Sequence, residues 1–137
     1  MRPVFALLIG VSCVLAGCSS PVAPSDAVAQ GVWGGNGIKM TVTAAGATLE
    51  FDCDAGAIAQ PLIFTQIGKF SAVGTYSFGR GGPRQQGDPP AVAHSTRYEG
   101  VVDGKAMQLS VFISDLSRNM GTFTLELDRQ PQLERCL

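Results

Sequence analysis

The sequence predicts an all-β protein: a small antiparallel up-and-down β-barrel or meander of seven or eight strands with one disulfide. Apolar and polar residues alternate along several short runs, as in strands with one buried face, and no run shows a convincing helical period. Short turns rich in glycine and aspartate separate these runs. Such sequential strands with single apolar faces favour a barrel over a sandwich.

The first predicted hairpin covers residues 38–43 and 49–54, where every second residue is apolar. The chain then turns at residues 54–56, and residues 58–65 form a strand whose hydrogen-bond ladder is limited by Pro61. After a turn at Ile67-Gly68, residues 70–78 place their apolar side chains on a single face.

The clearest hairpin covers residues 98–113, where Asp103-Gly104 fits a two-residue type I′ turn. Its second strand is expected to place four apolar side chains on one side: Met107, Leu109, Val111 and Ile113. A looser connection at 115–120 leads to a strand at 121–128. The last segment, 133–137, is expected to close the sheet.

The N-terminus has the pattern of an export signal. Arg2 precedes an apolar run at residues 4–15, which is too short to span a bilayer as a permanent helix. The following Leu15-Ala16-Gly17-Cys18 resembles the lipobox of bacterial lipoproteins. The resemblance implies a signal peptide at 1–17, acylation of Cys18 and attachment of the mature chain to a membrane.

Residues 19–30 contain two prolines and three serines, so residues 18–30 are expected to be a lipidated start and flexible tether before a barrel domain at 31–137. The expected location is the bacterial cell envelope. In an organism with two membranes, Ser19 favours the periplasmic face of the outer membrane, because aspartate at this position is associated with inner-membrane retention.

Composition and charge limit the partners. The 137 residues carry a net charge of −1, and removal of the signal with Arg2 brings it to about −2. No basic stripe interleaved with aromatic residues is present, so nucleic acid is not an expected partner.

Once Cys13 leaves with the signal and Cys18 is acylated, Cys53 and Cys136 remain as an even pair in an oxidising compartment. A disulfide between them is the expectation. The alternative is a two-cysteine metal site, which needs further ligands, and the chain contains a single histidine, His94.

The segment 79–94 is the longest predicted loop, with four glycines and three prolines in sixteen residues. Loops of this length are usually either functional or mobile, so it is read as a mobile insertion or as a contact loop at one barrel mouth. His94 lies in no G-x-S-x-G or comparable nucleophile motif. Glu50, Asp52 and Asp54 are interpreted as the solvated side of a strand. No catalytic residue, metal or cofactor is predicted.

Two resemblances accompany these patterns. The G-x-W of Gly31 to Trp33 at a strand start is similar to the lipocalin and calycin pattern, in which a C-terminal arginine, here Arg129, packs over the tryptophan. Most of the mature domain resembles a family of small exported bacterial lipoproteins of no assigned function, through W-G-G at 33–35, L-E-F-D-C at 49–53 and Y-E-G-x-V-x-G-x-x-M-x-L-x-V at 98–111.

The predicted function is therefore a binding or interaction module without catalytic activity. If it carries a small apolar ligand, the expected contacts are the inward aromatic and thioether groups: Met40, Phe51, Phe70, Tyr76, Tyr98, Met107 and Phe123. If it is an inhibitor of lysozyme or a protease, the expected contacts are Arg84, Arg97 and Tyr98 at residues 79–98. A structural role in the envelope is a third alternative.

Overall fold

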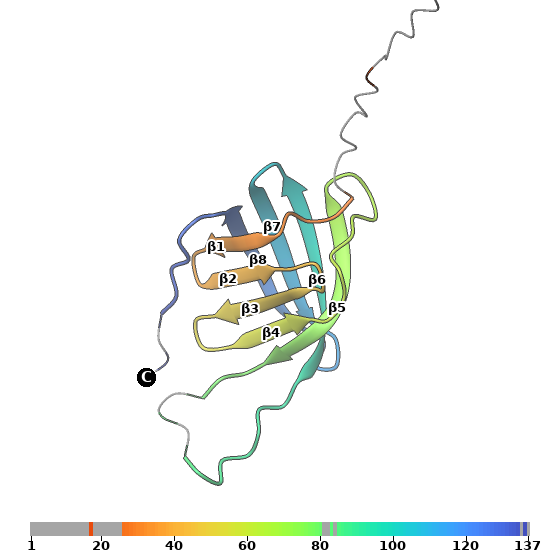
Figure 1. Ribbon diagram of the computed structural model, residues 1–137. Coiled ribbons are helices and arrows are strands. Elements are labelled where there is room, and N and C mark those ends of the chain that lie inside the picture. Colours follow the sequence, from red (N-terminus) through yellow and green to blue (C-terminus); the bar gives the residue numbers. More distant parts are fainter. Residues whose placement is uncertain (1–16, 18–25, 81–82, 84, 135, 137) are drawn as a thin grey trace, which may run out of the picture.

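A computed structural model of the chain describes residues 17, 26–80, 83, 85–134 and 136, and Figure 1 shows their arrangement. Eight antiparallel strands form a closed barrel in sequential order, in which β1 also pairs with β8. The strands are β1 (Gly31–Gly35), β2 (Ile38–Val42), β3 (Ala47–Phe51), β4 (Ala55–Ile58), β5 (Lys69–Ser77), β6 (His94–Asp103), β7 (Ala106–Ile113) and β8 (Arg118–Leu127). The predicted all-β up-and-down barrel is confirmed.

No helix in the described part of the chain has the length and apolar character needed to cross a membrane.

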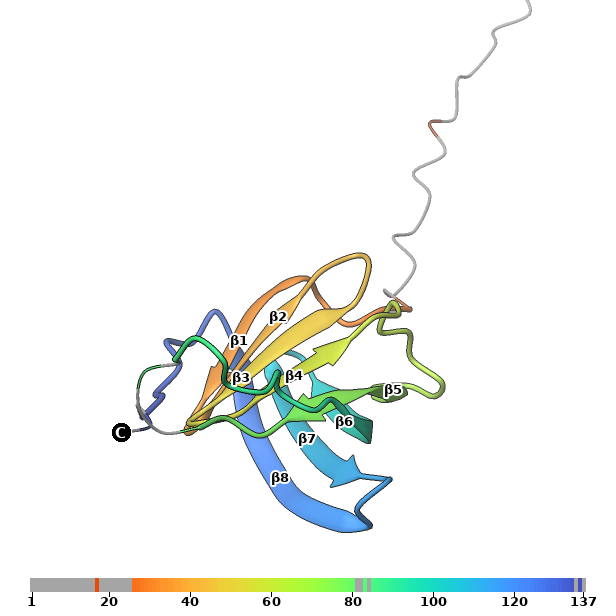
Figure 2. The same cartoon turned by 90° about the horizontal axis from the view of Figure 1, so that it is seen from below.

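The up-and-down order of the strands decides which connections lie at each end of the barrel. The entry end, where residues 26–30 lead into β1, carries three connections: 43–46, 59–68 and 104–105. The far end carries four: 36–37, 52–54, 78–93 and 114–117. Figure 2 shows the described parts of loop 78–93 and of the C-terminal segment at one end, and loop 59–68 with residues 26–30 at the other.

The C-terminal segment runs along the outside of β1 from the entry end to the far end. Gln132 forms an isolated parallel bridge with Asn36, and Cys136 forms a disulfide with Cys53, with their Cα atoms 5.1 Å apart. The predicted disulfide is confirmed. It joins the turn between β3 and β4 to the end of the chain.

Side chains fill the barrel's interior. In β2, β3 and β7 every second residue points inward and is buried, as the alternation of apolar residues predicted. A side chain that bordered an internal space large enough for water would expose area to it. Nine interior residues expose none: Trp33, Ile38, Met40, Thr96, Tyr98, Leu109, Val111, Ile113 and Leu125. The centre around these residues is therefore close-packed.

Several predicted boundaries were wrong: β6 starts at His94 and not at Tyr98, and β8 starts at Arg118 and not at Gly121. Ala55–Ile58 is the strand β4, not a turn, because pairing with β3 on one side and β5 on the other stabilises residues too small to show an apolar period. Residues 59–68 form a loop with one isolated bridge at Ile63. Since β8 on β1 closes the barrel, the described residues after 132 form no strand.

The turn of the clearest hairpin is displaced by one residue from its predicted position. Asp103 pairs with Ala106, so the two-residue connection is Gly104-Lys105. Only Gly104 has a positive φ, 59°, which matches a type II′ turn and not the predicted type I′ turn.

Candidate functional site

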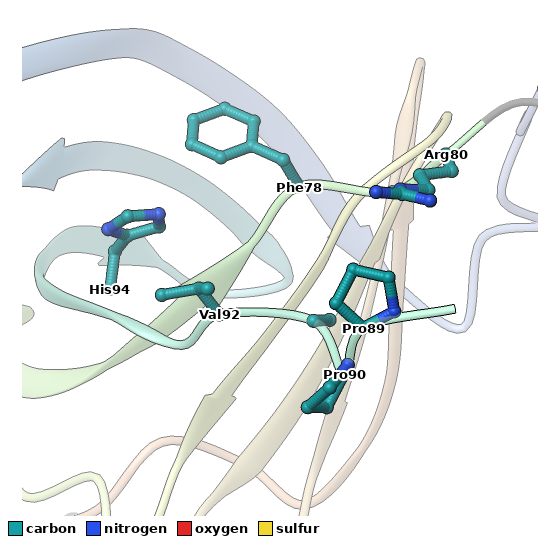
Figure 3. Close-up of a pocket in the computed structure, with 8 residues that line it drawn as sticks. Phe78, Arg80, Pro89, Pro90, Val92 and His94 are labelled. Carbon is teal, nitrogen blue, oxygen red and sulfur yellow. The ribbon is translucent and has the colours of Figure 1, made fainter. Parts of the chain in front are cut away.

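A cleft of about 370 Å³ lies at the far end, between the two arms of loop 78–93 and beside His94 of β6. Its lining is mostly apolar and proline-rich: Phe78, Gly79, Arg80, Pro89, Pro90, Ala91, Val92 and His94. Figure 3 shows Phe78 and His94 on one side, Arg80, Pro89 and Pro90 on the other, and Val92 between them. The two arms of the long loop therefore form the walls of the cleft, and His94 borders it from β6.

Asp54 fixes the point where the chain leaves β5. One carboxylate oxygen accepts a hydrogen bond from the Tyr76 hydroxyl at 2.5 Å, and the other accepts one from the Gly79 backbone N–H at 2.9 Å. Gly79 passes so close to the backbone of the 52–54 turn that a Cβ there would collide with the carbonyl oxygen of Cys53. Only glycine fits this close approach.

Phe78 is half-buried at the mouth and is contacted from three sides. The Tyr76 ring lies 5.2 Å from it and the His94 ring 5.6 Å, both edge to face, and the Arg118 guanidinium lies 5.5 Å from its centroid. Aromatic pairs and a cation over a ring each contribute on the order of 1 kcal/mol. These contacts hold Phe78 as a fixed floor for the cleft.

His94 is held from the opposite side by the turn between β7 and β8. Its Nδ1 lies 3.0 Å from Asp115 Oδ2, and its side chain is mostly buried. An imidazole fixed by a carboxylate presents its remaining ring nitrogen in a defined direction. The pair thus gives the cleft one oriented polar group.

The loop wall carries a cation. Arg80 is exposed, and its guanidinium lies 3.6 Å from Asp88, a loose ion pair in solvent. Asp88 also accepts a hydrogen bond from the Gln85 backbone N–H at 2.8 Å. Because the exposed pair is weak, Arg80 is free to exchange Asp88 for a carboxylate on a partner.

Tyr76 connects the cleft to the barrel interior. Burial, reinforced by the hydrogen bond to the Asp54 carboxylate, raises the pKa of the Tyr76 phenol above its ordinary value. The group therefore stays neutral and keeps donating. On its other side the Tyr76 ring lies 5.0 Å from Phe51, which in turn lies 5.3 Å from Phe123.

The chemical groups that line the cleft are suited to binding. No serine, threonine or cysteine is among its described lining residues. Ser95 follows His94 on β6, but successive side chains of a strand point to opposite faces. It is exposed on the outer wall.

The three acids 50, 52 and 54 do not share a strand face, because β3 ends at Phe51. Glu50 pairs with Lys39 at 3.3 Å, and Asp52 accepts a hydrogen bond from the Glu134 N–H at 2.9 Å. Within the described residues no three histidine, cysteine or acidic side chains gather as a metal site.

The residues predicted to contact a small apolar ligand all belong to the interior. Six of them are buried among one another or their neighbours: Met40, Phe51, Phe70, Tyr76, Tyr98 and Met107. Phe123 is partly buried against the same core. None of the seven lines the far-end cleft.

The residues predicted to contact a protein are scattered. Tyr98 is wholly buried, where its hydroxyl donates to the Thr75 carbonyl at 2.6 Å and burial raises its pKa, so it offers nothing to a partner. Arg97 lies on the outer wall of β6, paired with Glu99 at 3.2 Å and 5.4 Å from the centre of the Phe112 ring. Arg84 and the predicted lipid site Cys18 lie outside the described residues.

Trp33 is buried in β1, with its indole N–H donating to the Ala29 carbonyl at 3.0 Å. The cation–π contacts found among the described residues are those of Arg97 and Arg118, and neither involves Trp33. Arg129 approaches β1 through its backbone carbonyl, next to Gly34.

Sequence reasoning missed Asp115 and Arg118 as members of the site. The predicted up-and-down order was enough to find them, because it places the connection after β7 at the same end of the barrel as the connection after β5. Pairing these two loops would have brought Asp115 to His94.

Comparison with family models, curated proteins and solved structures finds no match to this chain.

Proposed function

We propose that this protein is a lipid-anchored interaction module of the bacterial cell envelope, without catalytic activity, whose far-end cleft contacts a partner protein. The observation that carries the proposal is that the chain enters the barrel at the end opposite the cleft. The chain enters β1 at one end, and the cleft of Phe78, His94 and the proline-rich loop lies at the other. With lipid on Cys18, the cleft is directed away from the membrane.

The cleft fits a partner of mixed chemistry. Phe78, Pro89 and Val92 offer an apolar surface for one side chain, and Arg80 offers an exposed guanidinium for a carboxylate. The rigid floor and the prolines of the loop lower the entropy that binding must overcome. An envelope hydrolase such as a lysozyme or a protease is one partner class, in which case the protein is an inhibitor.

The packing of the interior favours this proposal over an apolar-ligand carrier. A guest at the centre would have to displace side chains such as Met40, Tyr98 and Leu109, none of which borders free space. Opening that space in the core would cost several kcal/mol for each large side chain displaced.

Site-specific photo-crosslinking in intact cells tests the cleft. A photoreactive residue at Val92 is expected to yield a discrete protein adduct, and the same residue at Val73 is expected to yield none. The two valines are a matched pair, exposed by 67% and 63%, with Val73 on the outer wall of β5. Equal adducts at both positions, or none at either, would contradict the proposal.

A charge reversal sharpens this test. Arg80→Glu is expected to weaken the Val92 adduct, because it places a carboxylate where the partner's own carboxylate would bind. The exposed Arg97→Glu on the outer wall is the control and is expected to leave the adduct unchanged.

The anchor is tested separately. Cys18→Ser is expected to abolish acyl labelling and to release the protein from the membrane fraction. Continued sedimentation of this variant with membranes would contradict the anchor and leave the crosslinking result unaffected.

A further inference from the structure

Loop 59–68, at the entry end, forms a short antiparallel pair with the segment that leads into β1. The Val28 N–H donates to the Leu62 carbonyl at 3.0 Å, and the Phe64 N–H donates to the Asp26 carbonyl at 2.7 Å. The segment that leads into β1 is therefore fixed beside this loop, and Figure 1 shows the two running together. The described chain thus enters the barrel at this point.

The tip of the loop is apolar and in solvent. The Lys69 N–H donates to the Gln66 carbonyl at 3.0 Å, so Ile67 and Gly68 are the central residues of a tight turn. Ile67 is 102% exposed and Ile63 is 51% exposed, although turn tips usually carry polar residues. Since an exposed isoleucine gains no burial on folding, the fold does not account for Ile67.

The surroundings extend this apolar surface. Residues 58–68 contain no acidic or basic residue. Phe64, Ile67 and Val102 line a cleft of about 620 Å³ between the loop and the β6–β7 turn. The charges next to it are of both signs, Asp26 and Asp103 against Lys69, so an occupant is held by apolar contact and not by net charge.

The length of chain before the loop indicates the occupant. Asp26 lies eight positions after Cys18, and eight Cα-to-Cα steps span at most about 28 Å when the chain is fully extended. An acyl chain on Cys18 thus keeps this end of the barrel within reach of the bilayer. One or two isoleucines bind a membrane weakly on their own, but a short tether makes their contact intramolecular and raises its effective concentration.

We propose that Ile63 and Ile67 insert into the interfacial region of the bilayer that holds the acyl anchor, so that the loop acts as a second, non-covalent membrane contact. This inference rests on the lipid anchor of the proposed function. The two contacts orient the barrel with its entry end on the membrane and its far-end cleft outward.

Tryptophan reporters in the full-length acylated protein test this contact, in vesicles of phosphatidylcholine with brominated acyl chains. Ile67→Trp is expected to shift its emission to the blue and to be quenched by the bromines. Val92→Trp, at the far end, is expected to do neither. Both positions are exposed, and Trp33 is fully buried and gives the same background in each.

Two further variants identify the source of the signal. Ile63→Ser in the Ile67→Trp protein is expected to reduce the quenching, because the loop then loses half of its apolar contact. Cys18→Ser in the same protein is expected to abolish the quenching, because the loop alone binds weakly. Added salt is expected to change neither the shift nor the quenching.

The outcomes separate the two proposals. If the acylated protein floats with vesicles and Ile67→Trp stays unquenched, the loop contact is wrong and the anchor stands. A blue shift without quenching, together with concentration-dependent dimerisation, would assign the loop to a second copy of the chain and overturn the membrane contact. If the acylated protein does not float with vesicles, the anchor and the loop contact both fail, while crosslinking at Val92 still tests the cleft.

Discussion

Alkaline pH should unfold this protein through its two tyrosines, which are its only ones. Tyr76 and Tyr98 expose 2% and 0% of their surface, and their hydroxyls donate to Asp54 and to the Thr75 carbonyl. Burial raises the pKa of both phenols, and the Asp54 carboxylate raises that of Tyr76 further. The folded state therefore holds both protons at a pH where the unfolded chain releases them.

The sign and size of the effect follow from this difference. Below about pH 10, the ordinary pKa of tyrosine, both states are protonated and the stabilising contribution is fully present. Above it, the unfolded state binds fewer protons, so the free energy of unfolding falls by about 1.4 kcal/mol per pH unit for each tyrosine. The two together give about 2.8 kcal/mol per pH unit until the pH reaches the folded-state pKa values. A domain stable by about 5–10 kcal/mol would lose that stability within about 2 to 4 pH units.

Urea denaturation at a series of pH values measures the slope, and the ultraviolet absorbance of tyrosinate reports ionisation directly. We expect tyrosinate to appear together with loss of the β-sheet circular dichroism. Tyr76→Phe and Tyr98→Phe should each halve the slope. Tyrosinate that appears near pH 10 in a protein that is still folded would refute the reasoning.

Two other predictions concern the disulfide and the glycine that hold the far end of the barrel together. Replacing Cys53 and Cys136 by alanine removes a disulfide that joins positions 83 apart in the sequence. The loss of this cross-link should lower the free energy of unfolding by about 4.5 kcal/mol. A loss below about 1 kcal/mol in urea denaturation would contradict the stabilising role given to the bond. Gly79→Ala should cost about 2 kcal/mol, because the new methyl group meets the Cys53 carbonyl and the exit of β5 must shift. Urea denaturation measures this loss, and the Val92 crosslink should weaken with it; unchanged stability would show that the close approach is not required.

The strands that sequence reasoning identified best are those whose own pattern is strong. In β7, Met107, Leu109, Val111 and Ile113 alternate without a break, and all four are buried. Burial of one face stabilises such a run wherever it lies in the barrel, so its period of two is readable locally. The residues Ala55 to Ala57 carry no such period, and β4 exists because two stronger strands flank it.

The sequence by itself determined the all-β class, the sequential order of the strands, the disulfide and the long loop, because each depends on patterns within or between short segments. Only the tertiary structure decided which residues meet at the far end. Phe78 follows β5 and Arg118 begins β8, two strands that do not pair with each other, and the closed barrel brings the guanidinium to 5.5 Å from the ring centroid. Closure likewise buried Tyr98, an expected contact residue, and left Ile67 in solvent. The reason is physical: a strand pattern specifies which side chains share a face, whereas the number and tilt of the strands in the closed sheet decide whether that face encloses space or fills it.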